Sequence, residues 1–218
     1  MSRTGAPPVR ARLRALRSPV VRTPRLDLVL PDRAYDAQVV RLLNDRSVTR
    51  WTLHIPFPYR RADARAYHRR WPAGRRAGTN LSLQIVRRAD GRLLGGIGLH
   101  KINAEHRSAE VGYWIGRPYR RQGYAREALA AVVRLVFRRL GLERLEARVF
   151  PGNEASCQLL LVTGFAYEGR MRRSIRKAGR ARDELVYARL AADPPPPAAS
   201  PPGARPRGAA RPSGTPTR

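Results

Sequence analysis

The chain has 218 residues, a formal net charge of +28 and a single cysteine. This length suits one domain of ordinary size, which can bury a core without disulfides or metals, and one cysteine excludes an internal disulfide. No run of 18 uncharged apolar residues occurs, and no apolar segment lies near the N-terminus. We therefore expect no membrane span, no secretory signal, and a cytoplasmic location with Cys157 reduced.

The positive charge is almost entirely arginine, since 42 of the 44 basic residues are Arg. Residues 1–20 carry +5 and residues 191–218 carry +3, which leaves +20 between them. A field of this size attracts nucleic acid, ribosomes and anionic ligands in a salt-dependent way. The Arg residues are nevertheless spread over every segment, and no basic-aromatic RNA-binding signature accompanies them. A compositional bias and a nucleic-acid surface both stay open.

Both ends of the chain lack the pattern of a folded element. Residues 1–20 show little periodicity, and proline, alanine and arginine dominate residues 191–218. Such segments cannot build a core. We expect a disordered basic tail over 1–20, a disordered Pro/Ala/Arg-rich tail over 191–218, and one folded domain over 21–190.

The first half of the domain alternates apolar segments with turn residues. Asp32 is placed to cap a helix, because a short side-chain oxygen at that position accepts from the free N–H groups of the first turn. The pair Asp90-Gly91 lies between two apolar segments and predicts a hairpin turn. In chain order, we expect a strand over 26–30, a helix from Asp32 to Asn44, a helix over 63–71 before the break at 74–78, and hairpin strands over 81–86 and 93–99.

The second half predicts a strand, a helix and a parallel strand. Residues 109–115 extend the sheet, and apolar residues at 128, 131, 132, 135, 136 and 140 predict a helix over 125–140 that Gly141 ends. A crossover of this length makes the next strand, 145–150, parallel to the first. A helix from Glu154 and strands over 166–175 and 183–190 complete an α/β (α+β) fold: a mixed, mostly antiparallel sheet of about seven strands, with one parallel pair and flanking helices.

The segment Arg120-Arg-Gln-Gly-Tyr-Ala125 joins the strand to the helix in this crossover. The first turn of a helix leaves backbone N–H groups free and carries the positive end of the helix dipole, so an anion is favoured there. Gly123 and Ala125 put no bulk over these groups, and arginine side chains match phosphate oxygens. The segment is neither G-x-x-x-x-G-K-[ST] nor G-x-G-x-x-G. It predicts a phosphate site of another kind, at the carboxyl ends of two parallel strands.

The same segment fits the Q/R-x-x-G-x-G/A loop of the GCN5-related N-acetyltransferases (GNAT superfamily), and the chain resembles that family over about residues 23–190. Within it, the chain is most similar to the Rim-type ribosomal-protein-alanine N-acetyltransferases. Three further stretches carry the resemblance in the right order: Thr23-Pro-Arg-Leu-Asp-Leu; Leu42-Leu-Asn-Asp-Arg-Ser-Val-Thr-Arg-Trp51 with Pro56-Phe-Pro-Tyr; and Asn153-Glu-Ala-Ser156 leading to Gly164-Phe165.

The resemblance implies acetyl-CoA as co-substrate and no metal. It implies that the two parallel strands splay apart, that the pantetheine arm of the coenzyme lies between them, and that a backbone N–H of the strand 112–115 faces the developing oxyanion. The residues that it implies for coenzyme binding are Tyr113, Trp114, Ile115, Arg120, Arg121, Gln122, Gly123, Tyr124, Ala125, Asn153 and Ser156.

The candidate catalytic residues are Glu110, His54 and Ser156. Glu110 lies on the central strand, where a partly desolvated carboxylate can accept the ammonium proton through water; a structural partner for an arginine is its alternative role. Histidine is a common general base in proteins, but His54 shows no carboxylate partner in the sequence, so a packing role competes. Many relatives carry a Tyr seven residues after the Asn, where this chain has Leu160, which leaves Ser156, a water or solvent to protonate the thiolate.

Other polar residues near these positions have weaker cases. His100 and Glu168 are expected to be structural or secondary. Cys157 has no visible Cys-His-Asp arrangement, so we expect a small core residue. For Asn153, a helix cap is the alternative to a contact with the coenzyme.

The sequence thus predicts an N-acetyltransferase that moves an acetyl group from acetyl-CoA to a primary amine by direct attack in a ternary complex. The acceptor is a protein N-terminus or a small amine. The alternative is a catalytically weak protein of the same fold that binds ribosomes or nucleic acid through its basic surface. No membrane partner is expected, and a homodimer stays open.

Overall fold

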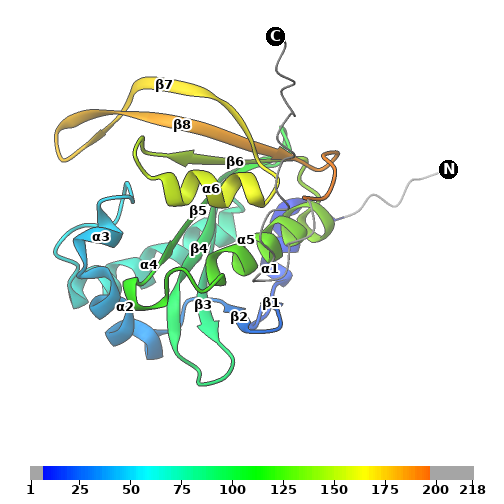
Figure 1. The fold of residues 1–218 in the computed structure, drawn as a ribbon. Helices are drawn as coiled ribbons and strands as arrows, with labels where there is room; N and C mark the ends of the chain where they lie inside the picture. The colour runs from blue at the N-terminus through cyan, green and yellow to red at the C-terminus, as the bar shows by residue number, and fades with distance from the viewer. Residues whose placement is uncertain (1–6, 197–218) are drawn as a thin grey trace, which may run out of the picture.

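The computed structural model describes residues 7–196, which form one mixed sheet of eight strands flanked by helices (Figure 1). The spatial order is β1-β2-β3-β4-β5-β6-β8-β7. Only β5 and β6 are parallel; every other neighbouring pair is antiparallel. The strands are β1 Val21–Arg22, β2 Leu26–Val29, β3 Leu81–Arg87, β4 Leu93–Asn103, β5 Ser108–Ile115, β6 Arg144–Val149, β7 Ala166–Lys177 and β8 Arg180–Leu190.

The fold class is confirmed, with eight strands where about seven were expected, because the two-residue β1 adds to the edge of β2. The hairpin at Asp90-Gly91 joins β3 to β4, and the crossover from β5 to β6 is parallel, both as predicted. The long β7–β8 hairpin forms the far edge of the sheet and arches beyond the helices (Figure 1).

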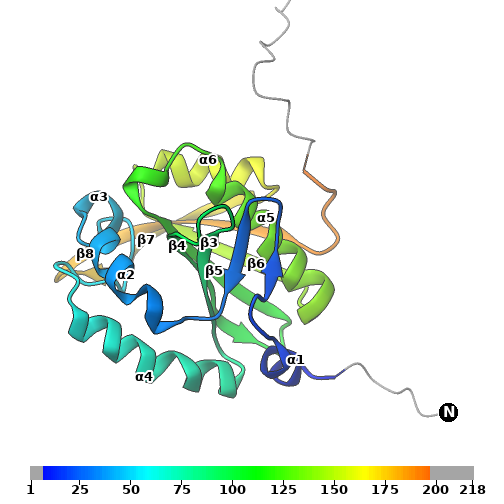
Figure 2. The ribbon, with the colours of Figure 1, turned by 90° about the horizontal axis from the view of Figure 1, so that it is seen from below.

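The helices lie on both faces of the sheet. α5 and α6 cover one face, and α2, α3 and α4 lie on the other (Figure 2). The side chain of Asp32 accepts from the backbone N–H of Ala34 and so caps the helical segment that leads into α2. The helices are α1 Val9–Ala15, α2 Asp36–Leu43, α3 Arg46–Thr49, α4 Arg61–Ala77, α5 Tyr124–Arg134 and α6 Glu154–Val162.

The core is centred on α5. Its predicted apolar stripe is buried along its whole length, and a π-helical turn over Leu135–Leu140 continues the helix to Gly141. Gly141 has φ 71°, a left-handed conformation that glycine adopts without steric cost, and it ends the helix as expected. On β6, Leu145, Ala147 and Val149 are buried, and the residues between them are less so. The strand therefore turns alternate side chains toward the core.

The N-terminal expectation is wrong for part of its length, since residues 9–15 form α1. Leu13 is 0% exposed and Leu16 is 3% exposed, so both belong to the core. The guanidinium of Arg75 donates to the carbonyls of Leu13 and Leu16, and Arg12 donates to the carbonyl of Leu140. Burial of two leucines outweighs the weak periodicity of this segment. Residues 1–6 and 197–218, where the remainder of both predicted tails falls, lie outside the described residues.

The helix expected over 63–71 extends to Ala77. Gly74 does not interrupt it, and the missing side chain leaves room for Asn80, since a Cβ at Gly74 would lie 2.8 Å from the Asn80 side-chain nitrogen. The helix ends at Gly78, which has φ 84°. Across residues 7–196, no helix is both long and apolar enough to cross a membrane.

Replacing Leu13 by Ala tests whether α1 belongs to the folded domain. Removal of a fully buried leucine side chain leaves a cavity, and we expect a loss of about 2–5 kcal/mol in the free energy of unfolding. Urea unfolding followed by circular dichroism measures it. Ala11→Ser, at an exposed position of the same helix, is the matched control. Equal stability of the two variants would contradict the packing of α1.

Candidate active site

The parallel strands β5 and β6 stay paired over only three residues each, Ser108–Glu110 with Arg144–Glu146. Past this point β5 remains bonded to β4 as far as Ile115, and β6 remains bonded to β8 as far as Val149. The two strands therefore diverge, and within the described part of the chain no strand pairs with the β6-facing edge of residues 111–115. We call the region between residues 111–115 and 147–149 the V; its apex is at Glu110.

An anion-binding loop lies beyond the open end of the V. Gly123 precedes the first turn of α5 with φ 79°, and no side chain caps the helix. No described residue accepts a hydrogen bond from the backbone N–H groups of residues 121–126. Tyr124 and Ala125 are the first two residues of the helix, so their N–H groups are among these free donors. The loop can therefore hold an anion, as the sequence indicated.

The loop is held in place from the N-terminal part of the domain. The carboxylate of Glu127, in the first turn of α5, lies 2.6 Å from the hydroxyl of Thr23 and accepts from the backbone N–H and Nε of Arg25. Arg25 also donates to the carbonyl of Gln122. Burial disfavours the charged form of Glu127 and raises its pKa, but the hydrogen bonds from Thr23 and Arg25 have the larger effect, so the pKa of Glu127 is lowered. The Thr23-Pro24-Arg25 motif thus positions the anion-binding loop between β5 and α5, which we call the phosphate loop.

The two arginines of the loop behave differently. Arg120 donates to the hydroxyl and carbonyl of Ser47 and to the carbonyl of Ile115, so it braces the loop against α3. Burial lowers its pKa, and Asp45 partly opposes this. Arg121 is exposed and has φ 60°. The side-chain amide of Gln122 donates to the carbonyl of Pro118. Of the three long side chains, only that of Arg121 extends into solvent without such a bond in the described structure.

A hollow of about 400 Å³ lies beside the loop. The guanidinium of Arg25 lies 4.6 Å from the ring centre of Tyr124, one of the lining residues. Cationic walls next to free N–H groups suit the anionic end of a ligand. The hollow is lined by Pro24, Arg25, Arg87, Arg88, Ala89 and Tyr124.

Two hydroxyls join β5 to α6 on one face of the V. The Oη of Tyr113 lies 2.8 Å from the Oγ of Ser156. Burial raises the pKa of Tyr113 to about 12, so its hydroxyl keeps its proton at neutral pH. Asn153 precedes α6, and its side chain makes no capping bond, whereas Leu160 is fully buried. The structure therefore brings Tyr113 and Ser156 together and leaves the Asn153 side chain available.

Trp114 and Ile115 end β5 on opposite faces. Both residues pack against the main core, but only Trp114 also packs against the small second cluster, which consists of Leu43, Val48, Tyr59 and Ala64. The indole lies so close to Gly96 of β4 that a Cβ there would be 2.7 Å from Nε1. Tyr113, which contacts Ser156 of α6, and Trp114, which contacts the second cluster, are neighbours on the strand and meet different helices, as alternating side chains of a strand do.

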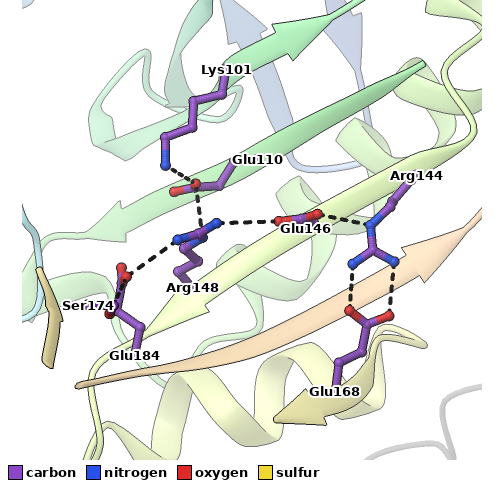
Figure 3. A network of polar contacts seen from close by, with 8 residues as sticks. All are labelled: Lys101, Glu110, Arg144, Glu146, Arg148, Glu168, Ser174 and Glu184. Carbon is purple, nitrogen blue, oxygen red and sulfur yellow. Dashed lines mark hydrogen bonds and ion pairs between the residues drawn. The ribbon is translucent and has the colours of Figure 1, made fainter. Parts of the chain in front are cut away.

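Glu110 lies at the apex of the V and is held by two cations. Its carboxylate accepts from the Nζ of Lys101 at 2.9 Å and lies 3.4 Å from the Nε of Arg148 (Figure 3). About a fifth of the Glu110 side chain is exposed, against 68% for Lys101. The candidate base thus pairs with a less exposed guanidinium on one side and with an exposed amine on the other.

Arg148 is the centre of a wider ion network on this face of the sheet (Figure 3). Besides Glu110, it pairs with Glu146 on its own strand and with Glu184 on β8. The Glu184 side chain is 6% exposed and also accepts from the hydroxyl of Ser174. Buried carboxylates need such partners. Glu168 joins the network at its far end: it pairs with Arg144, which also pairs with Glu146 and lowers the pKa of the Glu168 carboxyl.

Two histidines lie near Glu110. His100 is its register partner on β4, and the imidazole lies close to the backbone of Gly112. Desolvation of the ring lowers the pKa of His100; Glu110 opposes the shift, and the nearby His54 adds to it. His54 is an exposed loop residue after α3. The structure therefore brings Glu110 and His54 to the same region. His100, for which the sequence favoured a structural role, lies there too.

Lys177, the last residue of β7, binds the turn that follows α3 and lies beside the end of β6. Its ammonium donates to the carbonyls of Thr49, Arg50 and Thr52 at 2.7, 2.9 and 2.6 Å. The same Nζ lies 5.4 Å from the ring centre of Phe150, just after β6. Burial lowers the pKa of Lys177. The β7–β8 hairpin is thus fastened across the segment that follows α3.

Sequence reasoning missed three residues here: Lys101, Arg148 and Lys177. Alternation along β6 places Arg148 on the face of Glu110, and that signal was present in the sequence. Lys101 depends on an irregularity of β4, and Lys177 on the reach of a long hairpin, and neither has a local pattern. Cys157 is buried, as expected of a core residue. Over residues 7–196 there is no group of three or more His, Cys, Asp or Glu side chains arranged for a metal.

Comparison with known proteins identifies the relatives of this chain. The sequence profile of the family described as acetyltransferase (GNAT) domain matches residues 25–166. An uncharacterized N-acetyltransferase, YoaA of Bacillus subtilis (strain 168), is 44% identical over 103 residues, or 47% of this chain and 58% of that protein. The aligned regions span less than two thirds of the curated relatives, between 55% and 62% of their length.

Solved structures share the fold. RimJ of Mycobacterium smegmatis, in complex with CoA-disulfide, has a TM-score of 0.70 and 25% identity, over 76% of this chain and 81% of that one. A spermidine N-acetyltransferase from Vibrio cholerae, in complex with CoA and spermine, has a TM-score of 0.67 over 78% of this chain and 98% of that one. At 21% identity, the second likeness concerns the fold alone.

Replacing Glu127 by Gln tests the tie between the phosphate loop and β2. Because the folded pKa of Glu127 lies below the unfolded value of 4.5, its contribution is present above pH 4.5 and is lost as pH falls through the folded pKa. We expect Glu127→Gln to lower the free energy of unfolding by about 1–2 kcal/mol at pH 7, with the difference from the parent shrinking in acid. Urea titrations at several pH values measure it. Glu154→Gln, at the start of α6, is the control, and a pH-independent difference would refute the tie.

Proposed function

The chain belongs to the acetyltransferase (GNAT) domain family, and we propose that it transfers an acetyl group from acetyl-CoA to a primary amine by direct attack in a ternary complex. One observation carries the proposal: the free edge of β5 leads from an uncapped, glycine-opened helix terminus to a carboxylate at the apex of the V. The five residue-to-residue steps from Ile115 to Glu110 span about 17 Å of extended strand. An extended arm anchored at the loop therefore ends near Glu110.

The loop and the strand edge bind different parts of acetyl-CoA. The free N–H groups of residues 121–126 receive the diphosphate, with Arg121 beside them, and the edge of residues 111–115 pairs with the amides of the arm as an added strand does. Tyr113, Ser156 and Asn153 supply hydrogen-bonding groups along one side. Acetyl-CoA brings the chemistry, an acyl group activated as a thioester.

At the apex, Glu110 accepts the proton of the acceptor ammonium, directly or through a water. Arg148 keeps the carboxylate on the acceptor face, and a backbone N–H of residues 112–115 stabilises the oxyanion. His54 and His100 are placed to bind the acceptor or relay its proton. Leu160 offers no acid for the thiolate, so Ser156 or solvent protonates it, which a thiol of ordinary acidity permits.

The acceptor is a protein N-terminus or a small amine. The similarity to RimJ at 25% identity supports the first, and the fold that is shared with a spermidine acetyltransferase keeps the second in view. The high positive charge would add a salt-sensitive attraction to ribosomes or nucleic acid. A cytoplasmic location fits these acceptors.

A weakly catalytic binding protein of the same fold is the second candidate, and Leu160 favours it, because the position of the usual acid is filled by a core residue. A screen of amines and peptides for release of CoA thiol separates the two. Turnover of any amine supports the enzyme; retention on ribosomes without turnover, in protein that binds acetyl-CoA, supports the binding protein.

Glycine substitution tests the loop. Gly123→Glu adds a strained left-handed residue, bulk and a negative charge beside the free N–H groups, and we expect acetyl-CoA binding to be lost in calorimetry. Gly179→Glu is the matched control: its φ of 76° imposes the same backbone strain, and it lies in the β7–β8 turn with no atom within 4 Å of the added Cβ. Unchanged affinity of the Gly123 variant would show that the loop is misassigned.

Acetyl-CoA should also raise the melting temperature of the parent protein, because a ligand that binds only the folded state stabilises it by mass action. The Gly179→Glu variant should keep this shift and the Gly123→Glu variant should lose it. Differential scanning fluorimetry measures both. A parent protein that shows no shift at saturating ligand would overturn the proposed function.

Replacing Glu110 by Gln tests the base. If Glu110 accepts the acceptor proton, the loss in acetyl transfer should be about 10²–10⁴-fold near neutrality and should shrink as pH rises, because the acceptor amine then deprotonates in solution. The rate of CoA thiol release as a function of pH measures it. A loss of equal size at every pH would assign Glu110 a structural role.

A further inference from the structure

Primary amines are scarce in this protein. Of its 44 basic residues only Lys101 and Lys177 are lysines, and the arginines that replace them elsewhere keep their protons at every physiological pH and are not nucleophiles. Lys101 lies at the apex of the V, whereas Lys177 lies beside the turn after α3 and Phe150. Of the two side-chain amines that an acyl thioester could modify, one is thus at the proposed reaction centre.

An irregularity in β4 directs Lys101 to the apex. The register of β4 with β5 shifts between His100 and Asn103, and Lys101 has φ 48°, a left-handed backbone conformation that is sterically unfavourable for a residue with a side chain. As a result both consecutive side chains reach the same stretch of β5: the His100 imidazole lies close to Gly112, and the Lys101 ammonium meets Glu110. In a regular strand they would alternate between the two faces. The strained residue brings its amine to 2.9 Å from the Glu110 carboxylate.

We propose that Lys101 is an internal acceptor, which the protein acetylates at its own site. The inference rests on the proposed function, because it requires acetyl-CoA in the V. The Lys101 ammonium already makes with Glu110 the contact that an external acceptor would make. At 68% exposure it is free to leave that contact and turn toward the thioester carbon.

The step balances without a further reactant. The ammonium of Lys101 gives one proton to the Glu110 carboxylate, and the amine nitrogen attacks the thioester carbonyl. The carbon–nitrogen bond forms as the carbon–sulfur bond breaks. The attacking nitrogen loses a second proton to solvent, and the CoA thiolate leaves and takes up a proton. The products are acetyl-Lys101 and free CoA.

Lys177 is the built-in comparison. Its Nζ donates three hydrogen bonds to carbonyls of one turn, and the side chain would have to give up all three to present a lone pair. Lys101 has only the one bond to Glu110. We therefore expect acetylation at Lys101 and protection of Lys177.

Acetylation of Lys101 changes the apex. The amide carries no charge, so Glu110 keeps only the pairing with Arg148 and no longer has an ammonium of its own chain in the place of the acceptor. An external amine then meets no internal competitor for the carboxylate. Modified and unmodified protein should differ in apparent affinity for the acceptor.

The test is peptide mapping by mass spectrometry of the full chain incubated with acetyl-CoA over a time course. We expect Lys101 to be acetylated at least about ten-fold faster than Lys177, as a positioned amine should be, with a first-order rate that does not change with protein concentration. Gly123→Glu should lose this labelling and Gly179→Glu should keep it. Lys101→Arg preserves a cation opposite Glu110 and should leave only the background at Lys177.

Three outcomes overturn the proposal. Equal labelling of Lys101 in the Gly123→Glu variant would show chemical acetylation in solution. A rate that rises with protein concentration would show that a second copy supplies the site. An unmodified Lys101 in protein that turns over external amines would exclude the internal acceptor and leave the proposed function standing, whereas protein that neither binds acetyl-CoA nor turns over amines fails both.

Discussion

The separation of β5 from β6 after three paired residues is the constraint on which the rest of the site depends. Had the pairing continued, the edge of residues 111–115 would be closed by main-chain bonds, and Glu110 would lie inside a continuous sheet. Each strand keeps its other neighbour to its end, so the sheet does not lose its order where it opens. An opening made by strand divergence exposes backbone donors and acceptors without burying them unsatisfied.

Several side chains keep the opening in shape, and most of them are arginines. Arg25 holds the phosphate loop to β2, Arg120 holds it to α3, and Arg148 joins β5, β6 and β8 through their carboxylates. Guanidinium groups with several donors suit such bridging. Some of the arginines thus have a structural role. Neither of the two explanations considered from the sequence, compositional bias and attraction of nucleic acid, includes this role.

The sequence predicted what local chemistry decides. Asp90-Gly91 set the hairpin and Gly141 ended the central helix, because each turn depends on its own residues. Prediction failed where distant packing decides: Leu13 is buried in α1, which Arg75 and the carbonyl of Leu140 hold from segments far along the chain. The site followed the same division. Its loop was recognisable from six residues, whereas the strained Lys101 beside Glu110 has no sequence signal.

The attachment of Lys177 has a consequence for how acceptor preference can diverge among relatives. Its three partners are main-chain oxygens, so the identities of residues 49, 50 and 52 do not enter the contact. Substitutions on that turn can change its side chains while the contact between the turn and the β7–β8 hairpin is kept. If acceptors bind beside the turn, acceptor preference can therefore change during evolution without loss of this tertiary contact.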